Sequence, residues 1–147
     1  MKTPLNVLLQ DKHRQVHTVA PDVSVVDAAR EMNRHNIGAL VVLDSSELVG
    51  IITERDILVR IVAGGLNPEN IRVRQVMTND PVCVTPDMTV EEAMLLVTEK
   101  RLRHLPVMHH NALYGLISSG DLTRWLVLDQ QHRIDDLNAY IVGVPAH

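Results

Sequence analysis

One seven-residue pattern occurs twice in the chain, as Gly50-Ile-Ile-Thr-Glu-Arg-Asp56 and as Gly115-Leu-Ile-Ser-Ser-Gly-Asp121. Each copy places a glycine and two aliphatic residues before a hydroxyl residue, and an aspartate follows three positions after that hydroxyl. This spacing is typical of a capping box, in which the hydroxyl and the acid each accept a hydrogen bond from a backbone amide at a helix N-terminus. Each copy therefore predicts a strand that runs directly into a helix.

The repetition extends well beyond these two stretches. When the chain is aligned on itself with Gly50 on Gly115, the match continues without a gap and gives 11 identities between Val19 and Arg60. Some of the matches are polar, such as Asp22 with Asp87, so they are not explained by common aliphatic residues alone. The chain thus contains two copies of one unit.

Both copies predict the same order of elements, β-α-β-β-α. An extended run precedes an amphipathic helix capped by Ser24 or Thr89, and a hairpin of two apolar strands leads into the helix after the motif. Because a unit of about 50 residues buries too little surface to be stable alone, we expect an α+β fold in which two β-α-β-β-α repeats pack as a pseudo-twofold pair. The predicted boundaries are residues 7–65 for the first repeat, 66–75 for a linker without a strong pattern, 76–131 for the second repeat, and 132–147 for a C-terminal segment with a helix over 133–143.

Composition excludes several classes of protein. The 147 residues carry a formal net charge of −4 and only 2% aromatic residues, which argues against a nucleic-acid polymer as partner. The single cysteine, Cys83, fits a reducing compartment. Because no apolar run is long enough to span a bilayer and the N-terminus lacks a secretion signal, we expect a cytoplasmic protein without a membrane partner.

The duplicated motif, together with Arg103-His-Leu-Pro-Val107, resembles the signature of the cystathionine β-synthase (CBS) domain family. The lead-in stretches 73–78 and 84–90 also match the family pattern, so the chain resembles a stand-alone tandem CBS pair. The resemblance implies that adenosine-containing ligands bind in clefts between paired repeats and that the protein forms a homodimer. It also implies ribose contacts from Asp56 and Asp121 and phosphate contacts near Thr53 and Ser118.

The residues themselves are compatible with such a ligand. A helix N-terminus offers free amides to a phosphate, and Arg55, Arg103 and His104 add donors. Without aromatic residues to stack on, an adenine must lie against aliphatic side chains. Each of these positions also has an ordinary structural explanation, as a capping or core residue. The full set of candidate nucleotide-binding residues is Thr18, Ala39, Leu40, Thr53, Arg55, Asp56, Cys83, Arg103, His104, Pro106, Ser118 and Asp121.

We therefore expect a regulatory ligand-sensing module that signals through a homodimer to an unknown regulated protein. The expected ligand is AMP, ADP or ATP, with S-adenosylmethionine or NADH ranked behind them, and no cofactor is required. No nucleophile elbow or phosphate loop occurs, so an enzyme is not expected. Two alternatives stay open: an oligomerisation or interaction module with vestigial clefts, and a metal-responsive protein based on its histidines, which include His13, His17, His104, His109 and His110.

Overall fold

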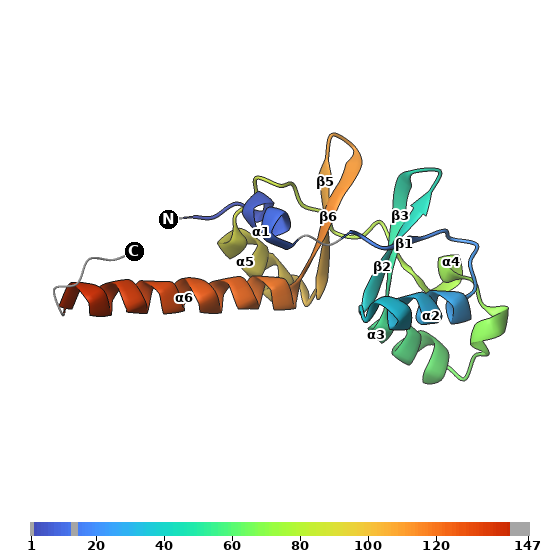
Figure 1. Ribbon diagram of the computed structural model, residues 1–147. Helices are drawn as coiled ribbons and strands as arrows, with labels where there is room; N and C mark the ends of the chain where they lie inside the picture. The colour runs from blue at the N-terminus through green and yellow to red at the C-terminus, as the bar shows by residue number, and fades with distance from the viewer. Residues whose placement is uncertain (1, 13–14, 142–147) are drawn as a thin grey trace.

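The computed structural model describes residues 2–12 and 15–141, and it confirms an α+β fold with two repeats of the β-α-β-β-α type, in which the first strand of the second repeat is reduced to an isolated bridge at Val84 (Figure 1). The elements of the first repeat are β1 (Thr18–Val19), α2 (Val25–His35), β2 (Ala39–Asp44), β3 (Glu47–Thr53) and α3 (Glu54–Asp56), which continues as the π-helical turn η1 (Ile57–Val62). The elements of the second are α5 (Val90–Lys100), β5 (His104–His109), β6 (Ala112–Ser118) and α6 (Ser119–Ile141). The remaining elements are α1 (Leu5–Lys12) before the first repeat, and the 3₁₀ turn η2 (Pro68–Asn70), α4 (Val73–Val76) and β4 (Thr78–Asn79) between the repeats.

The two sheets preserve the register of the sequence repeat. In the first, β1 pairs in parallel with β2, β2 and β3 form an antiparallel hairpin, and β4 adds to the free edge of β3. In the second, β5 and β6 form the hairpin, and Val84 makes a parallel bridge to Val107 where Val19 pairs with Val42 in the first repeat. Both hairpins contain an irregularity at the same place, between Val42 and Leu43 and between Val107 and Met108.

The first helix of each repeat begins and ends alike. The Ser24 hydroxyl accepts from the Asp27 amide at 3.1 Å, and the Thr89 hydroxyl accepts from the Glu92 amide at 3.2 Å. Both helices end at a residue in the left-handed conformation, Asn36 with φ 53° and Arg101 with φ 54°. Asparagine adopts this conformation readily, whereas a long side chain such as arginine does so at some cost.

Each repeat is completed by a segment that precedes the other repeat in the chain. Helix α1 lies beside α5 in Figure 1, and Leu5 and Leu8 are buried in the core of the second repeat. Helix α4 packs on the first repeat, where Val73 and Val76 are buried. The amide of Leu5 donates to Met88 O at 2.8 Å, and the amide of Val73 donates to Val23 O at 2.9 Å. These paired bonds show that α1 and α4 are equivalent, with Leu5 in the place of Val73.

The glycine of each duplicated motif makes room for the segment that crosses over. A Cβ at Gly50 would lie 2.6 Å from Met77 Sδ, and a Cβ at Gly115 would lie 2.6 Å from Leu9 Cδ2. Leu9 follows Leu5 by the same number of positions as Met77 follows Val73, so the two covering side chains are also equivalent. Any larger residue at either glycine would push its covering side chain off the strand.

Some expected features differ in the structure. The stretch 66–75, expected to be a linker, contains the start of α4 and contributes Val73 to the first core. The sequence did not reveal this helix because four residues are too few to produce a visible periodicity. The helix expected over 133–143 is the end of the continuous α6, which starts at Ser119 and runs across the predicted boundary at 131/132 (Figure 1). Residues 142–147 lie outside the described part of the chain, as does His13.

Candidate functional site

Two clefts lie between the repeats, and each is built from both of them. The first has a volume of about 820 Å³. One wall comes from the first repeat, with residues 15–17 ahead of β1 and the junction from α2 to β2 at residues 35–39. The opposite wall comes from the second repeat, with Ser118 and Asp121 at the start of α6.

The second cleft is the counterpart of the first, with a volume of about 580 Å³. Residues 80–82 and 101–104 of the second repeat form one wall, in the places that 15–17 and 36–39 occupy in the first cleft. Thr53, Glu54 and Arg55 of the first repeat form the other wall. Volumes of about 300–1,000 Å³ are usual for small-molecule sites, so either cleft is large enough for a mononucleotide.

The duplicated motif places a capped helix N-terminus at each cleft. Asp56 Oδ2 accepts from the Thr53 amide at 2.9 Å, and Thr53 Oγ1 accepts from the Asp56 amide at 3.1 Å. In the second repeat, Asp121 Oδ2 accepts from the Ser118 amide at 2.9 Å, and Ser118 Oγ accepts from the Asp121 amide at 3.0 Å. Both predicted capping boxes are therefore present. A carboxylate can accept about four hydrogen bonds, so a cap by itself does not exhaust it.

The two clefts differ in charge. The second is lined by three arginines, Arg55, Arg101 and Arg103, together with the acidic Glu54 and Asp80. The lining of the first contains no lysine or arginine among the described residues, and its polar groups are mainly imidazoles, amides and the Tyr114 hydroxyl. An anionic ligand with several phosphates is thus better matched by the second cleft.

Seven of the predicted site residues line a cleft. Ala39, Ser118 and Asp121 line the first, Thr53, Arg55 and Arg103 line the second, and His104 lines both. Arg55 and Arg103 belong to different repeats, yet the fold brings them to one cleft. The grouping of site residues therefore follows the clefts rather than the repeats, which the alignment of the chain on itself does not reveal.

The other five predicted residues lie elsewhere. Leu40 is fully buried in the first core and Pro106 is buried in β5, so neither forms a cleft wall. Thr18 and Cys83 are exposed outside both clefts, since the walls are formed by the residues just before them. Asp56 makes the same capping box as Asp121 but does not line the second cleft, and its Oδ1 lies 4.0 Å from Arg60 Nε.

The environment of Cys83 does not favour a nucleophile. Its Sγ–H donates to Pro81 O at 3.3 Å, and partial desolvation of the sulfur raises the pKa of the thiol. The reactive thiolate is thus less populated at neutral pH than in an ordinary cysteine.

Several cleft residues were missed by the sequence reasoning. In the first cleft they include His35 and Tyr114, together with His17, which the sequence singled out only for the metal-responsive alternative. In the second they include Asp80 and Arg101. The Tyr114 hydroxyl donates to Asn6 Oδ1 at 2.5 Å and so ties β6 to α1. The alignment of the two repeats pairs Asn36 with Arg101, and each of these residues ends its helix and lines a cleft. This pairing was the sequence observation from which Arg101 could have been added to the predicted site.

Comparison with known proteins agrees with this architecture. The family model described as "CBS domain" matches residues 12–63 and 73–128, once for each repeat. The chain belongs to the CBS domain family and carries the domain as a tandem pair.

Relatives and solved structures of the same family cover most of the chain. A mitochondrial CBS domain-containing protein of Arabidopsis thaliana is 42% identical over 127 residues, which are 83% of this chain and 62% of that protein. A CBS domain-containing protein of Bacillus subtilis is 37% identical over 74% of this chain and 76% of its own. The solved structure of a protein with CBS domains from Burkholderia ambifaria superposes with a TM-score of 0.83 at 38% identity, covering 87% of this chain and 96% of the other. The chain spans less than two thirds of the length of the Arabidopsis relative. We therefore argue the role of this chain from its own clefts and not from that relative.

No helix within residues 2–12 or 15–141 combines the length and the apolar character needed to cross a membrane. The Arabidopsis relative is a mitochondrial protein by name, so a cytoplasmic location for this chain stays a prediction.

Proposed function

We propose that this chain is a regulatory module that senses adenosine-containing nucleotides, with AMP, ADP or ATP as its ligand. The observation that carries the proposal is the pair of clefts at the interface of the repeats, each joining a helix N-terminus of one repeat to the strand lead-in of the other. A ligand bound there contacts both repeats at once, so its binding depends on their relative position. This is the property that a sensor requires.

The chemistry of the second cleft suits a nucleotide with several phosphates. Arg55 and Arg103 supply fork-shaped donors from opposite walls, and the Thr53 hydroxyl lies at the start of α3. Ile51, Val82 and Leu102 supply apolar surface in the same cleft. In the first cleft, Ala39 and Leu116 offer apolar surface, and Asp121 provides a carboxylate for ribose hydroxyls.

Signalling through a homodimer is part of the proposal. Leu58, Val59 and Val62 on η1 and Val127 on α6 expose 51–66% of their surface. Large exposed apolar side chains that gather on helices are typical of association surfaces. A second copy of the chain packed on these helices would transmit a change in the angle between the repeats.

The direct test is calorimetric titration and thermal shift with AMP, ADP, ATP, S-adenosylmethionine and NADH. We expect at least one adenine nucleotide to raise the melting temperature of the wild type. Arg103→Ala and Arg55→Ala should weaken ATP most, because both remove charged donors from the second cleft. Asp121→Asn, which retains an acceptor for the cap, should weaken the ligand of the first cleft.

Arg133→Ala is the matched control, since Arg133 lies on the exposed part of α6 and pairs with Asp129 at 3.3 Å, away from both clefts. If no nucleotide binds the wild type, or if Arg133→Ala weakens ATP as much as Arg103→Ala, nucleotide sensing is refuted. A stable oligomer without any ligand response would then favour an assembly module.

A further inference from the structure

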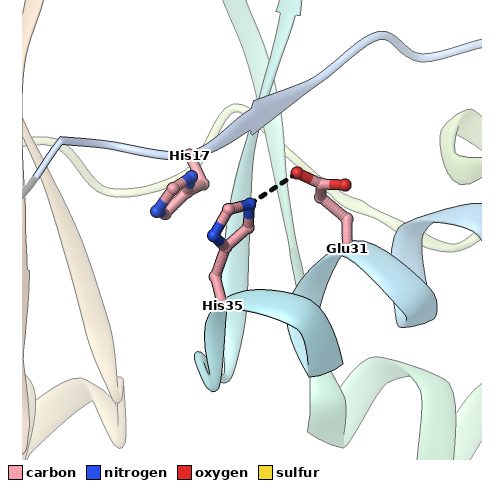
Figure 2. Close-up of side chains that lie close together, drawn as sticks. All are labelled: His17, Glu31 and His35. Atoms are coloured by element: carbon pink, nitrogen blue, oxygen red, sulfur yellow. Dashed lines mark hydrogen bonds and ion pairs between the residues drawn. The ribbon is translucent and has the colours of Figure 1, made fainter.

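One cluster of side chains on the wall of the first cleft has no part in the nucleotide chemistry above. Figure 2 shows His35 joined to Glu31 on α2, with the ring of His17 lying beside that of His35. His17 immediately precedes β1, while Glu31 and His35 are four residues apart on the same face of α2. One ligand atom from each of the three lies within 4.8 Å of the other two.

The structure assigns to these three residues a binding site for a divalent transition metal of the zinc type. Two imidazole nitrogens and a carboxylate oxygen are a donor set that Zn²⁺ accepts, with a fourth position left for water. Imidazole also selects Zn²⁺ over Mg²⁺ and Ca²⁺, which prefer oxygen ligands. The fourth position would face the cleft, because His17 and His35 both line it.

The backbone holds the three residues in place without the ion. The carbonyl of His17 accepts from the Val41 amide at 3.3 Å, which fixes its position beside β2. Glu31 Oε1 lies 2.8 Å from His35 Nε2, and its Oε2 accepts from Arg34 Nη1 at 2.9 Å. Two partners therefore orient the Glu31 carboxylate. Arg34 binds Oε2 and partly balances the negative charge, so Oε1 is the oxygen that lies next to His35.

Binding requires one local rearrangement. The rings of His17 and His35 are stacked with centroids 3.7 Å apart and planes 18° apart. The lone pair of an imidazole nitrogen lies in the plane of its ring, so two stacked rings hold their lone pairs in separate, nearly parallel planes. One ring must therefore turn about its Cβ–Cγ bond before both can share an ion. About 3.3–3.5 Å separates two ligand atoms on a tetrahedral zinc ion, so ligand atoms that lie within 4.8 Å of one another here must approach by up to about 1.5 Å. His35 is 32% exposed and the cleft is open beside it, so this rotation meets little resistance.

The test is titration of the metal-free protein with Zn²⁺ by calorimetry and with Co²⁺ by visible absorption. We expect one strong site per chain, with the d–d bands of four- or five-coordinate Co²⁺, and a higher melting temperature in Zn²⁺. His17→Ala, His35→Ala and Glu31→Gln should each lower the affinity by more than 10-fold, because each removes or weakens one of the three ligands from the protein. Far-UV circular dichroism verifies that the variants are folded.

His109→Ala is the matched control, because His109 also lies beside another histidine, with its ring tilted against that of His110 and centroids 3.9 Å apart in the β5–β6 hairpin. It should leave the strong site intact. The inference is overturned if the wild type shows no such Co²⁺ bands, if the bands survive in the His17→Ala/His35→Ala double variant, or if His109→Ala removes them. The metal alone is the probe, so the result is independent of the nucleotide proposal.

Discussion

The glycines of the duplicated motif should respond unequally to substitution by alanine. At Gly50, an added Cβ would meet Met77 Sδ at 2.6 Å and also the backbone oxygen of Thr78 at 2.8 Å. At Gly115, the three nearest atoms all belong to the side chain of Leu9. A side chain can turn aside, whereas the Thr78 carbonyl belongs to β4, which is paired with Gly50 itself.

The magnitudes follow from this difference. Overpacking against atoms that cannot move costs about 1–3 kcal/mol, and we expect Gly50→Ala to lower the free energy of unfolding by about 2–3 kcal/mol. At Gly115, movement of Leu9 relieves most of the strain, and the reduced backbone entropy of the unfolded chain offsets about 0.4–1 kcal/mol. Gly115→Ala should thus cost about 1 kcal/mol or less.

Thermal and urea unfolding provide the assay. At about 2–4 °C per kcal/mol for a chain of this size, Gly50→Ala should lower the melting temperature by about 5–10 °C and Gly115→Ala by no more than about 4 °C. Gly120→Ala is the control, because its Cβ would lie 3.6 Å from the nearest atom, Ser118 Oγ, within the first turn of α6. The reasoning is refuted if Gly115→Ala destabilises as much as Gly50→Ala, or if Gly50→Ala has no measurable effect.

Three further outcomes can be checked, two with variants and one with the unmodified chain. Leu5→Ala should lower the free energy of unfolding by about 2–5 kcal/mol, because Leu5 is fully buried in the second core. Leu95→Ala is the control, because Leu95 is 62% exposed and its loss should change that free energy by no more than about 0.5 kcal/mol. Equal losses in chemical unfolding would contradict the assignment of α1 to the second core. Thr53→Ala removes the cap of α3 and should cost about 1 kcal/mol, with Thr53→Ser retaining it; a loss with serine as large as that with alanine would exclude the cap as the cause. Desolvation raises the pKa of the Cys83 thiol, so its thiolate forms at higher pH than that of a free cysteine. When the alkylation rate is plotted against pH, its midpoint should therefore lie above that of a free cysteine. A midpoint below that of a free cysteine would contradict the desolvation of the sulfur.

Most of the fold was accessible from the sequence because the repeat is a strong signal. The capping boxes at Thr53 and Ser118 and the helix starts at Ser24 and Thr89 were all predicted from spacing and are present. These features depend on residues three positions apart, so no long-range information is needed to find them.

The clefts were less accessible, because they depend on how the repeats meet. Leu40 and Ala39 are neighbours in one strand, yet only Ala39 lines a cleft, since alternate side chains of a strand point to opposite faces. The cluster of His17 with Glu31 and His35 joins residues from two elements, and nothing in the local spacing pairs His17 with the other two. The role of α1 was hidden for the same reason, because its partners, such as Met88, lie in the other half of the chain.

The crossing of α1 and α4 separates the unit of sequence from the unit of folding. A half-chain cut at the repeat boundary would keep a helix that its own core does not use and would lack the helix that its core requires. Two such halves could be restored only by exchange, with each supplying the missing helix to the other. The two halves of one chain are thus related as the protomers of a helix-swapped dimer are, because each core contains a helix that belongs in sequence to the other half.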